Sequence, residues 1–336
     1  MTDLEMYPLS EVDPEEIKWL WYPYIAFGKV TIIQGDPGDG KTMLVSDIIS
    51  KLTKGEPLYE QDEPNPPTVC IYQTAEDGYA DTIVPRLDKF GADRSMVRVI
   101  REDKRQLSFT DPRIEEGIVS SGAHVLILDP MQAYIGADID MHRANEVRPV
   151  MHHLSDVAQR TGCAIILIGH MNKTKGANAI YRGLGSIDIP GAARSVCIVR
   201  HPIKSNEETY FAHSKCNIGP LGKTLVFEKS PDSWDYIGTC ELTADQLLNM
   251  SDSDEESSSG GGSRSKKAQV MQTLIELSLQ RDEIPSRELM EMFKAMDISV
   301  KTVKLARKDL GLQARQERDG WVLDLRPLRE KMRVRR

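Results

Sequence analysis

The stretch GDPGDGKT, residues Gly35–Thr42, joins the apolar run KVTIIQ (29–34) to the amphipathic run MLVSDIISKL (43–52). A strand, the spacing GxxxxGK[ST] and a helix together form a phosphate-binding loop. Glycines let backbone N–H groups surround phosphate oxygens, and the positive end of the helix dipole points at the same anion. A glycine-rich turn without a ligand would not account for Lys41. The stretch therefore predicts a nucleotide site in an α/β fold.

Each part of this loop has an expected role. Lys41 places a cation on the β- and γ-phosphates, and Thr42 offers its hydroxyl to Mg²⁺. The residues expected to contact the nucleotide are Gly35, Asp36, Pro37, Gly38, Asp39, Gly40, Lys41, Thr42 and Met43.

A metal at this loop also needs a carboxylate. VLILDP (125–130) ends an apolar run with Asp129. In an open α/β sheet, ligands lie in the crevice outside the C-terminal ends of the strands. We therefore expect Asp129 to hold Mg²⁺, directly or through water. The alternative is an aspartate that caps the turn before Pro130.

Hydrolysis requires a group that polarises the attacking water. TVCIYQTAEDGY (68–79) places Glu76 and Asp77 just after an apolar run. Either carboxylate could face the γ-phosphate, but Asp77 could instead cap the helix that follows it. This division makes Glu76 the better candidate for the catalytic base.

Short apolar runs alternate with longer amphipathic segments before Pro190. Buried strands are expected at 29–34, 68–74, 96–100, 124–129 and 163–170, with helices at 41–52, 77–91, 111–122 and 145–162. This alternation is typical of a doubly wound, mainly parallel sheet covered on both faces. The closely spaced runs at 194–200, 208–215 and 223–229 predict an antiparallel extension at the sheet edge.

A break in composition divides the chain. SDSDEESSSGGGSRS (Ser251–Ser265) lacks apolar periodicity, which predicts a flexible linker between domains at 1–250 and 266–336. The net charge is −8, but residues 264–336 carry 18 Lys and Arg against 11 Asp and Glu, which leaves −15 for residues 1–263. A basic second domain favours a polyanionic partner, and a solvated helical surface is the alternative.

Composition argues against several classes of protein. No apolar run approaches the ~20 residues of a membrane helix, and the acidic start of the chain is unlike a signal or transit peptide. The five cysteines are scattered without a CxxC pair. We therefore expect a cytoplasmic protein without a membrane partner or disulfides.

The first domain resembles the RecA-like ATPases, and among them the hexameric replicative helicases of the plasmid RepA type, relatives of the DnaB helicases. The resemblance implies that ATP is the nucleotide and that DNA and other copies of the chain are the partners. The segments that carry it are WLWYPYIAFGKVTIIQGDPGDGKT (19–42), QTAEDGYADTIVPRL (73–87), VLILDPMQAYIG (125–136), IGHMNK (168–173), YRGLGSIDIPGAARSV (181–196) and HSKCNIGP (213–220).

The resemblance also implies roles for residues after the fourth core strand. His170 would sense the γ-phosphate and pass its state to residues 172–190. That segment is rich in glycine, carries Lys173, Lys175 and Arg182, and resembles the central-channel loops that contact single-stranded DNA. A basic, flexible segment suits a phosphate backbone. The alternative is a charged surface loop.

In such rings a neighbouring subunit donates a cation to the transition state. The candidates are Arg182, Arg194 and Lys215. DnaB-type helicases have a Lys-x-Arg pair where this chain has Lys215-Cys216-Asn217, so the arginine of the pair is missing. We favour Lys215 together with one of the two arginines.

The second domain is predicted to be a winged helix-turn-helix. Helices are expected at 266–280, 284–296 and 300–310, with Ser286 and Ser299 as N-caps and Gly311 ending the third helix. Two short strands follow around an Asp319-Gly320 turn. The fold resembles the C-terminal winged helices of RepA-type ATPases from phages and mobile elements.

On the third helix, Val300, Val303 and Leu310 are expected to pack inward. The cations left for DNA are Lys301, Lys304, Arg307 and Lys308 on the helix and Arg315 and Arg318 on the wing. A protein-binding winged helix is the alternative. Three functions therefore remain open: a ring-shaped ATP-driven helicase, a RecA/KaiC-like recombination or annealing ATPase, and an ATP-gated DNA-binding regulator.

Overall fold

The computed structural model describes residues 6–102, 105–136, 138–171, 188–201, 208–230, 233–249, 270–271, 273–275, 277–278, 281–296, 298, 300–312, 314–317 and 320–327. The chain divides into two compact units, Met1–Met250 and Ser251–Arg336.

Nine of the described strands of the first unit form one sheet, in the order β11-β10-β9-β8-β3-β7-β6-β4-β5. From β8 to β5 all neighbours are parallel, whereas β8–β9, β9–β10 and β10–β11 are antiparallel. The strands are β3 (Val30–Gly35), β4 (Cys70–Thr74), β5 (Val97–Arg98), β6 (Val125–Asp129), β7 (Ala164–His170), β8 (Ser195–Arg200), β9 (Glu208–Cys216), β10 (Thr224–Lys229) and β11 (Trp234–Cys240).

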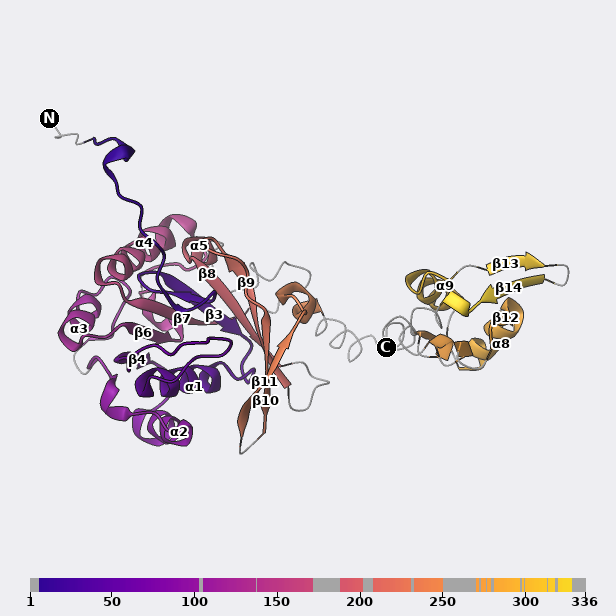
Figure 1. Cartoon of the computed structure of the whole chain (residues 1–336), viewed down its shortest axis with the longest axis horizontal. Coiled ribbons are helices and arrows are strands. Elements are labelled where there is room, and N and C mark those ends of the chain that lie inside the picture. Colours follow the sequence, from indigo (N-terminus) through magenta and orange to yellow (C-terminus); the bar gives the residue numbers. More distant parts are fainter. Residues whose placement is uncertain are drawn as a thin grey trace. The chain divides into compact units, whose positions relative to one another are not determined.

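Helices cover both faces of this sheet (Figure 1). Side chains of β6 alternate between the faces: Val125 and Ile127 pack in the core with α1 and α2, and Leu126 and Leu128 pack in the core with α3 and α4. Full burial of such a side chain stabilises the fold by about 1.5–3 kcal/mol. The helices are α1 (Lys41–Lys54), α2 (Val84–Phe90), α3 (Arg113–Ser121), α4 (Ala144–Thr161) and α5 (Asp188–Ala192).

Smaller elements complete this unit. They are the hairpin of β1 (Trp19–Trp21) and β2 (Ile25–Ala26), the 3-10 turns η1 (Leu9–Glu11), η3 (Arg94–Met96) and η4 (Met131–Tyr134), the π-helical turn η2 (Tyr79–Ile83), and a helical segment at 244–249. The last segment packs on β8 and β9 through Leu247 and Leu248.

The mainly parallel α/β sheet with its antiparallel extension is confirmed. The extension begins one strand later than the sequence predicted, because β8 pairs parallel with β3 and antiparallel with β9. In the part of the chain that the structure describes, no helix has both the length and the apolar character needed to cross a bilayer.

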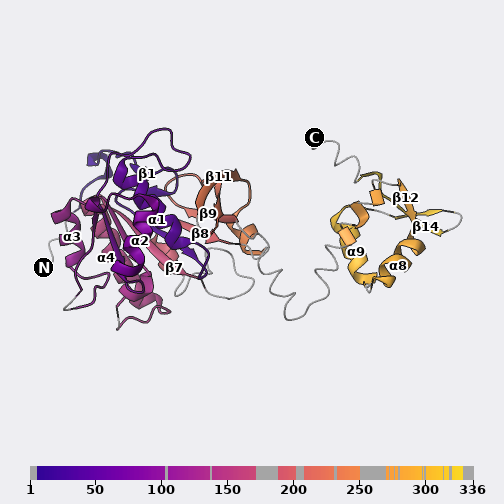
Figure 2. The same cartoon turned by 90° about the horizontal axis from the view of Figure 1, so that it is seen from below.

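The second unit has its own core, formed by apolar side chains such as Leu274, Leu289 and Phe293. Residues 270–278 are helical where described, and a three-stranded antiparallel sheet of order β12-β14-β13 lies beside α8 and α9 (Figure 2). The elements are β12 (Glu283–Pro285), α8 (Ser286–Ala295), α9 (Val300–Asp309), β13 (Ala314–Glu317) and β14 (Gly320–Asp324).

Three details of the second unit differ from the sequence predictions. Ser286 is the first residue of α8 rather than its N-cap, and Pro285, which has no capping side chain, precedes it. Val300 is 54% exposed because it begins α9, whereas Val303 is buried as expected. Gly320 already pairs with Glu317, so it belongs to β14 and not to the turn. Ser299 and Asp319 lie outside the described residues.

Candidate functional site

The GDPGDGKT loop turns from β3 into α1, as predicted. Gly38 and Gly40 have φ angles of 87° and 97°, which favour glycine. A side-chain carbon on Gly35 would lie 2.4 Å from the carbonyl oxygen of Val199. One on Gly40 would lie 2.9 Å from the Trp234 ring. The backbone therefore passes too close to β8 and β11 for other residues at these positions.

Lys41 is buried at the start of α1. Its Nζ donates hydrogen bonds to the carbonyl oxygens of Gly35 (2.8 Å) and Asp36 (2.9 Å). Burial lowers the pKa of this ammonium, and nearby carboxylates, first among them Asp39 and then Asp129, oppose that effect. The cation is thus held inside the loop, where a phosphate would replace the two carbonyl groups.

Asp129 ends β6 and is largely buried. Its Oδ2 accepts a hydrogen bond of 3.0 Å from the Tyr72 hydroxyl. Burial raises the pKa of this carboxyl, whereas Tyr72 and Lys41 lower it. With Oδ2 bound to Tyr72, Oδ1 is the carboxylate oxygen available to a cation, and Thr42 adds a hydroxyl from α1. Such hard oxygen donors fit Mg²⁺.

Glu76 and His170 meet at the same edge of the sheet. His170 Nε2 lies 3.7 Å from Glu76 Oε1, and the Glu76 side chain is 63% exposed. Backbone pairing aligns the strand ends, since Gly35 pairs with His170 and Thr74 pairs with Asp129. Among the described residues, His170 Nδ1 is buried without a hydrogen-bond partner. The expected base and sensor therefore lie together beside the phosphate loop.

The alternative role for Asp77 as a helix cap is wrong. The helical segment begins at Tyr79 with Gly78 at the N-cap, and no side chain caps it. The Asp77 carboxylate instead lies 3.2 Å from Arg86 Nη1. Asp77 is thus paired with a cation, whereas Glu76 lies 3.7 Å from His170.

Two of the cations predicted to act on a neighbouring subunit lie at the opposite end of the strands, near the N-terminal end of β8. Arg194 is exposed and immediately precedes β8. Lys215 Nζ donates to the carbonyl oxygens of Pro190 (2.6 Å), Gly191 (3.1 Å) and Ala193 (2.8 Å), at the C-terminal end of α5. The chain's own Lys41 follows the other, C-terminal, end of β3. Arg182, Lys173 and Lys175 lie outside the described residues.

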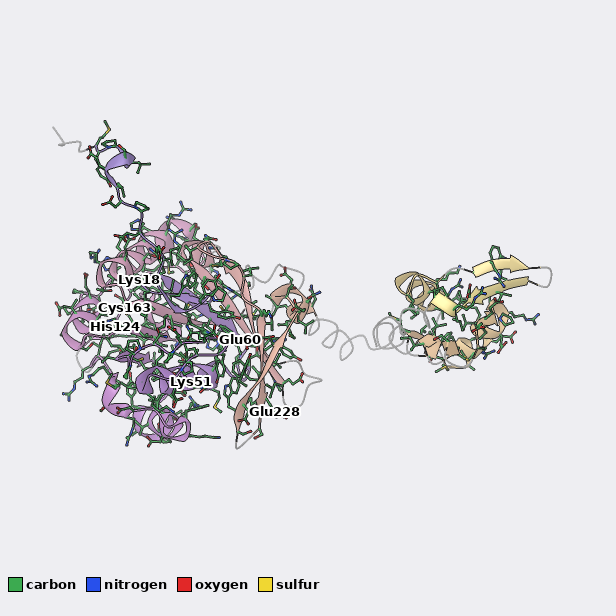
Figure 3. The ribbon with its side chains drawn as sticks, viewed as in Figure 1. Lys18, Lys51, Glu60, His124, Cys163 and Glu228 are labelled. Atoms are coloured by element: carbon green, nitrogen blue, oxygen red, sulfur yellow. The ribbon has the colours of Figure 1, made fainter. Side chains whose placement is uncertain are left out.

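A separate cavity of about 530 Å³ also lies at that opposite end of the strands. Lys18 and His124, labelled in Figure 3, line it together with Phe27, Gly28 and Lys29, just before β3 begins. None of the residues predicted to bind nucleotide lines this cavity. It therefore does not belong to the candidate site.

Sequence reasoning missed the residues that hold the phosphate loop from the side of β8–β11. Arg200 Nη1 contacts Asp36 Oδ2 and lies 3.4 Å from Asp39 Oδ2. Lys229 Nζ donates to the Gly38 carbonyl (2.9 Å). The available signal was the presence of Asp36 and Asp39 in a loop expected to bind an anion, because two carboxylates there require a nearby cation.

The predicted DNA-binding residues of the second unit divide into three groups. Lys304 is exposed on α9, whereas Arg307 is half-buried, and its Nε has no partner among the described residues. Burial lowers the pKa of Arg307. Arg315 on β13 pairs with Glu283 at 2.8 Å. The side chains of Lys301 and Lys308 lie outside the description, as does the whole of Arg318.

Two solved structures are similar to part of this chain. A KaiC-like protein from the hyperthermophilic archaeon Pyrococcus horikoshii OT3 is 18% identical, with a TM-score of 0.46, over 63% of this chain and 91% of that chain. The ATPase domain of G40P is 12% identical, with a TM-score of 0.48, over 62% of this chain and 84% of that chain. No curated protein matches the sequence.

The sheet order around β3 and the phosphate loop after it form a mainly parallel α/β core with a P-loop, as predicted. A family model described as an AAA domain, AAA_25, matches residues 4–176, just over half of the 336 residues. The matched range includes the phosphate loop, Glu76, Asp129 and His170. The chain therefore belongs to the AAA_25 family of AAA domains.

Proposed function

We propose that this protein is an ATP-driven motor on single-stranded DNA, a ring-shaped replicative helicase of the RepA type that hydrolyses Mg-ATP between subunits. Its first unit is a P-loop ATPase of the RecA class. The single observation that carries the proposal is the meeting of Lys41, Asp129, Glu76 and His170 at one edge of the sheet, directly before residues 172–190.

Nucleotide binding begins with an exchange of partners at Lys41. Its ammonium leaves the carbonyl oxygens of Gly35 and Asp36 and contacts the β- and γ-phosphates. The backbone N–H groups at the start of α1 point at the same anion. Thr42 and Asp129 would hold Mg²⁺, whose charge stabilises negative charge that develops on the phosphoryl oxygens.

Hydrolysis then depends on Glu76. Its exposed carboxylate can orient a water and accept its proton as the water attacks the γ-phosphorus. The bond from that phosphorus to the β–γ bridging oxygen breaks as the new one forms. His170 lies 3.7 Å from Glu76, so loss of the γ-phosphate changes the surroundings of both side chains at once.

The link from hydrolysis to movement is chain connectivity. His170 ends β7, and residues 172–190, with Lys173, Lys175 and Arg182, follow directly. A change at His170 would shift this basic segment along a DNA backbone. In a hexameric ring, Lys215 with Arg194 or Arg182 of a neighbouring copy would complete the site.

The second unit would bring the ring to duplex or forked DNA. We assign it as a winged helix because of its element order and its three-stranded sheet. Lys304 is exposed on α9, which corresponds to a recognition helix. Lys304, Arg307, Met290 and Trp321 share a cavity of about 670 Å³, where the cations can meet a phosphate and the indole can stack.

Fork unwinding by the full chain tests the proposal, with Glu76→Gln as the main variant. We expect ATP hydrolysis to fall about 10²–10⁴-fold with ATP affinity retained, since the amide fits but cannot accept a proton. Unwinding should disappear with hydrolysis. Asp77→Asn is the matched control, because Asp77 is paired with Arg86, and a larger loss in that variant would reverse the assignment of the base.

The wild-type protein distinguishes the motor from the other two functions. ATP hydrolysis with strand annealing or pairing but no unwinding would favour a recombination or annealing factor. ATP-dependent DNA binding without unwinding would favour a regulator that acts through the second unit. Absence of ATP hydrolysis with and without polynucleotide would contradict both the motor and the annealing ATPase.

A further inference from the structure

The phosphate loop of this protein carries two negative charges. Asp36 and Asp39 place two carboxylates within a loop that must receive a triphosphate. Asp39 is only 5% exposed, and its side chain accepts hydrogen bonds from the backbone N–H groups of Asp36 (2.8 Å) and His201 (3.2 Å). Carboxylates and phosphates repel each other, and partial burial strengthens the repulsion. Lys41 alone does not balance them.

Arg200 supplies the missing charge. It ends β8, is 7% exposed, and places Nη1 against Asp36 Oδ2 and 3.4 Å from Asp39 Oδ2. Burial raises the pKa of Asp39, and Arg200 is the strongest opposing influence. The Nε–H of this guanidinium is buried and has no partner among the described residues. A buried cation with an unused donor therefore lies against the loop.

The contact also links Arg200 to Lys41. The Asp36 side chain meets Arg200, while the Asp36 carbonyl accepts a hydrogen bond from Lys41 Nζ (2.9 Å). Because one residue makes both contacts, the guanidinium fixes the peptide that holds the ammonium. Parallel pairing of β8 with β3 brings the end of β8 to this point, where the Val199 carbonyl abuts Gly35.

We infer that Arg200 is a positioning residue for the triphosphate: it offsets the loop carboxylates and holds Asp36 in the shape that presents Lys41 to the phosphates. The inference rests on the proposed ATP binding at this loop. Arg200 acts through Asp36 and Asp39. Its effect should therefore grow with the negative charge of the nucleotide.

Isothermal titration of the full chain with ATP, ADP and AMP tests this inference. Arg200→Gln should weaken ATP binding about 10- to 100-fold, ADP binding less, and AMP binding least. Adding Asp39→Asn should recover at least a third of the lost log affinity, because it removes one uncompensated carboxylate while keeping an oxygen for the Asp36 N–H. Arg200→Lys keeps the positive charge but not the planar guanidinium group, so its ATP affinity should lie between those of the wild type and Arg200→Gln.

Arg113→Gln is the matched control. Arg113 also pairs with a buried aspartate, Asp111 at 2.8 Å, but it belongs to α3 and does not touch the phosphate loop. This variant should lose thermal stability without changing the ratio of ATP to AMP affinity. If Arg200→Gln does not fold, Asp39→Asn alone decides, since it should tighten ATP binding about 3- to 10-fold and AMP binding less.

The outcomes separate this inference from the proposed function. Equal losses for all three nucleotides, without recovery by Asp39→Asn, would mean that Arg200 has only a structural role and would overturn the inference. Unchanged ATP affinity in Arg200→Gln would also overturn it and would leave the ATPase intact. A wild-type protein that binds no nucleotide would overturn the proposed function and this inference with it.

Discussion

The phosphate loop has two different neighbours in the sheet. On one side, the parallel strand β4 leads to Glu76, and the parallel strands β6 and β7 end in Asp129 and His170. On the other side, β8 and the antiparallel strands β9–β11 contribute Arg200, Lys229 and Trp234. The first side carries groups that can react with a γ-phosphate and its attacking water. The second side carries groups that support the loop.

The second side is built around aromatic rings. Trp234 stacks on Phe227 with ring centroids 4.9 Å apart, and Tyr59 meets Phe227 edge-on at 4.9 Å. Lys51, labelled on α1 in Figure 3, lies with its Nζ 5.1 Å from the centroid of the Tyr59 ring. Glu60 accepts a hydrogen bond from the Tyr236 hydroxyl. This cluster ties α1, and thus the loop, to the antiparallel extension.

The comparison indicates that the residues expected to act in hydrolysis and the residues that hold the loop come from different strands, so their effects can be measured separately. Changes on the parallel side should reduce hydrolysis and spare the fold. Changes on the side of β8–β11 should spare the hydrolytic step: those in the aromatic cluster should reduce stability, and that of Arg200 should reduce nucleotide affinity.

The largest expected effect is that of Asp129→Asn. Hydrolysis should fall about 10³-fold, because a neutral amide holds Mg²⁺ far less well than a carboxylate. The free energy of unfolding should stay the same or rise, since burial already disfavours the charged form of Asp129. Steady-state ATP hydrolysis and urea unfolding of the same samples measure both.

Asn still accepts the hydrogen bond from the Tyr72 hydroxyl, so the local fold should be kept. Tyr72→Phe is the companion variant, which removes that hydrogen bond and keeps the carboxylate. It should retain most of the hydrolysis. If Asp129→Asn lowered the free energy of unfolding enough to explain its loss of hydrolysis, the division between the two sides would be wrong.

The next effect is that of Trp234→Ala on stability. Trp234 is 8% exposed and fills the space against Gly40, so its removal should cost about 3–5 kcal/mol of unfolding free energy. Calorimetry of the full chain can follow the transition that ATP shifts upward, since bound ligand stabilises only the unit that binds it.

Trp321→Ala in the second unit is the matched control for this variant. Trp321 is 54% exposed, so its loss should change stability by less than about 0.5 kcal/mol. Hydrolysis per folded molecule should fall only a few-fold in Trp234→Ala. A hydrolysis loss comparable with that of Asp129→Asn, at unchanged stability, would place Trp234 with the reacting groups instead.

The same division explains how much of the site was predictable. Lys41, Asp129 and Glu76 follow from local rules, because a spaced motif marks the loop and parallel strands end at a common edge, whereas His170 followed only from the family resemblance. Pairing of Gly35 with His170 and of Thr74 with Asp129 then brings these residues together. The mainly parallel sheet was predictable from the alternation of apolar runs with amphipathic segments.

The contacts on the side of β8–β11, which support the loop, were not predictable by local rules. Arg200 and Asp36 are 164 positions apart, and no short pattern joins them. Arg200 stood in the sequence as the last residue of an apolar run without an assigned role. The errors in the second unit have local causes: Val300 is exposed because it begins α9, and Gly320 extends the β13–β14 ladder by one pair.

The smallest expected effect is a dependence on pH at Asp47. This residue lies on α1 and accepts a hydrogen bond from the Tyr59 hydroxyl on the side of β8–β11. Burial raises its pKa from 3.8 to about 6, with Lys51 and Lys54 opposing. The folded protein therefore binds the Asp47 proton more tightly than the unfolded chain does. Its stability must fall as pH rises from about 4 through about 6, where the buried carboxyl ionises.

Asp47→Asn isolates this contribution. Between pH 4 and pH 7 the unfolding free energy of the wild type should fall by about 2–3 kcal/mol relative to the variant, measured by urea titration at each pH. Asp111→Asn should show the opposite sign below about pH 4, where the wild type loses stability relative to the variant as pH falls, because Arg113 lowers the pKa of Asp111 and the ionised form is the stable one. Parallel stability curves for the wild type and Asp47→Asn would mean that Asp47 stays solvated, and the contact between α1 and the extension would then be looser than the aromatic packing indicates.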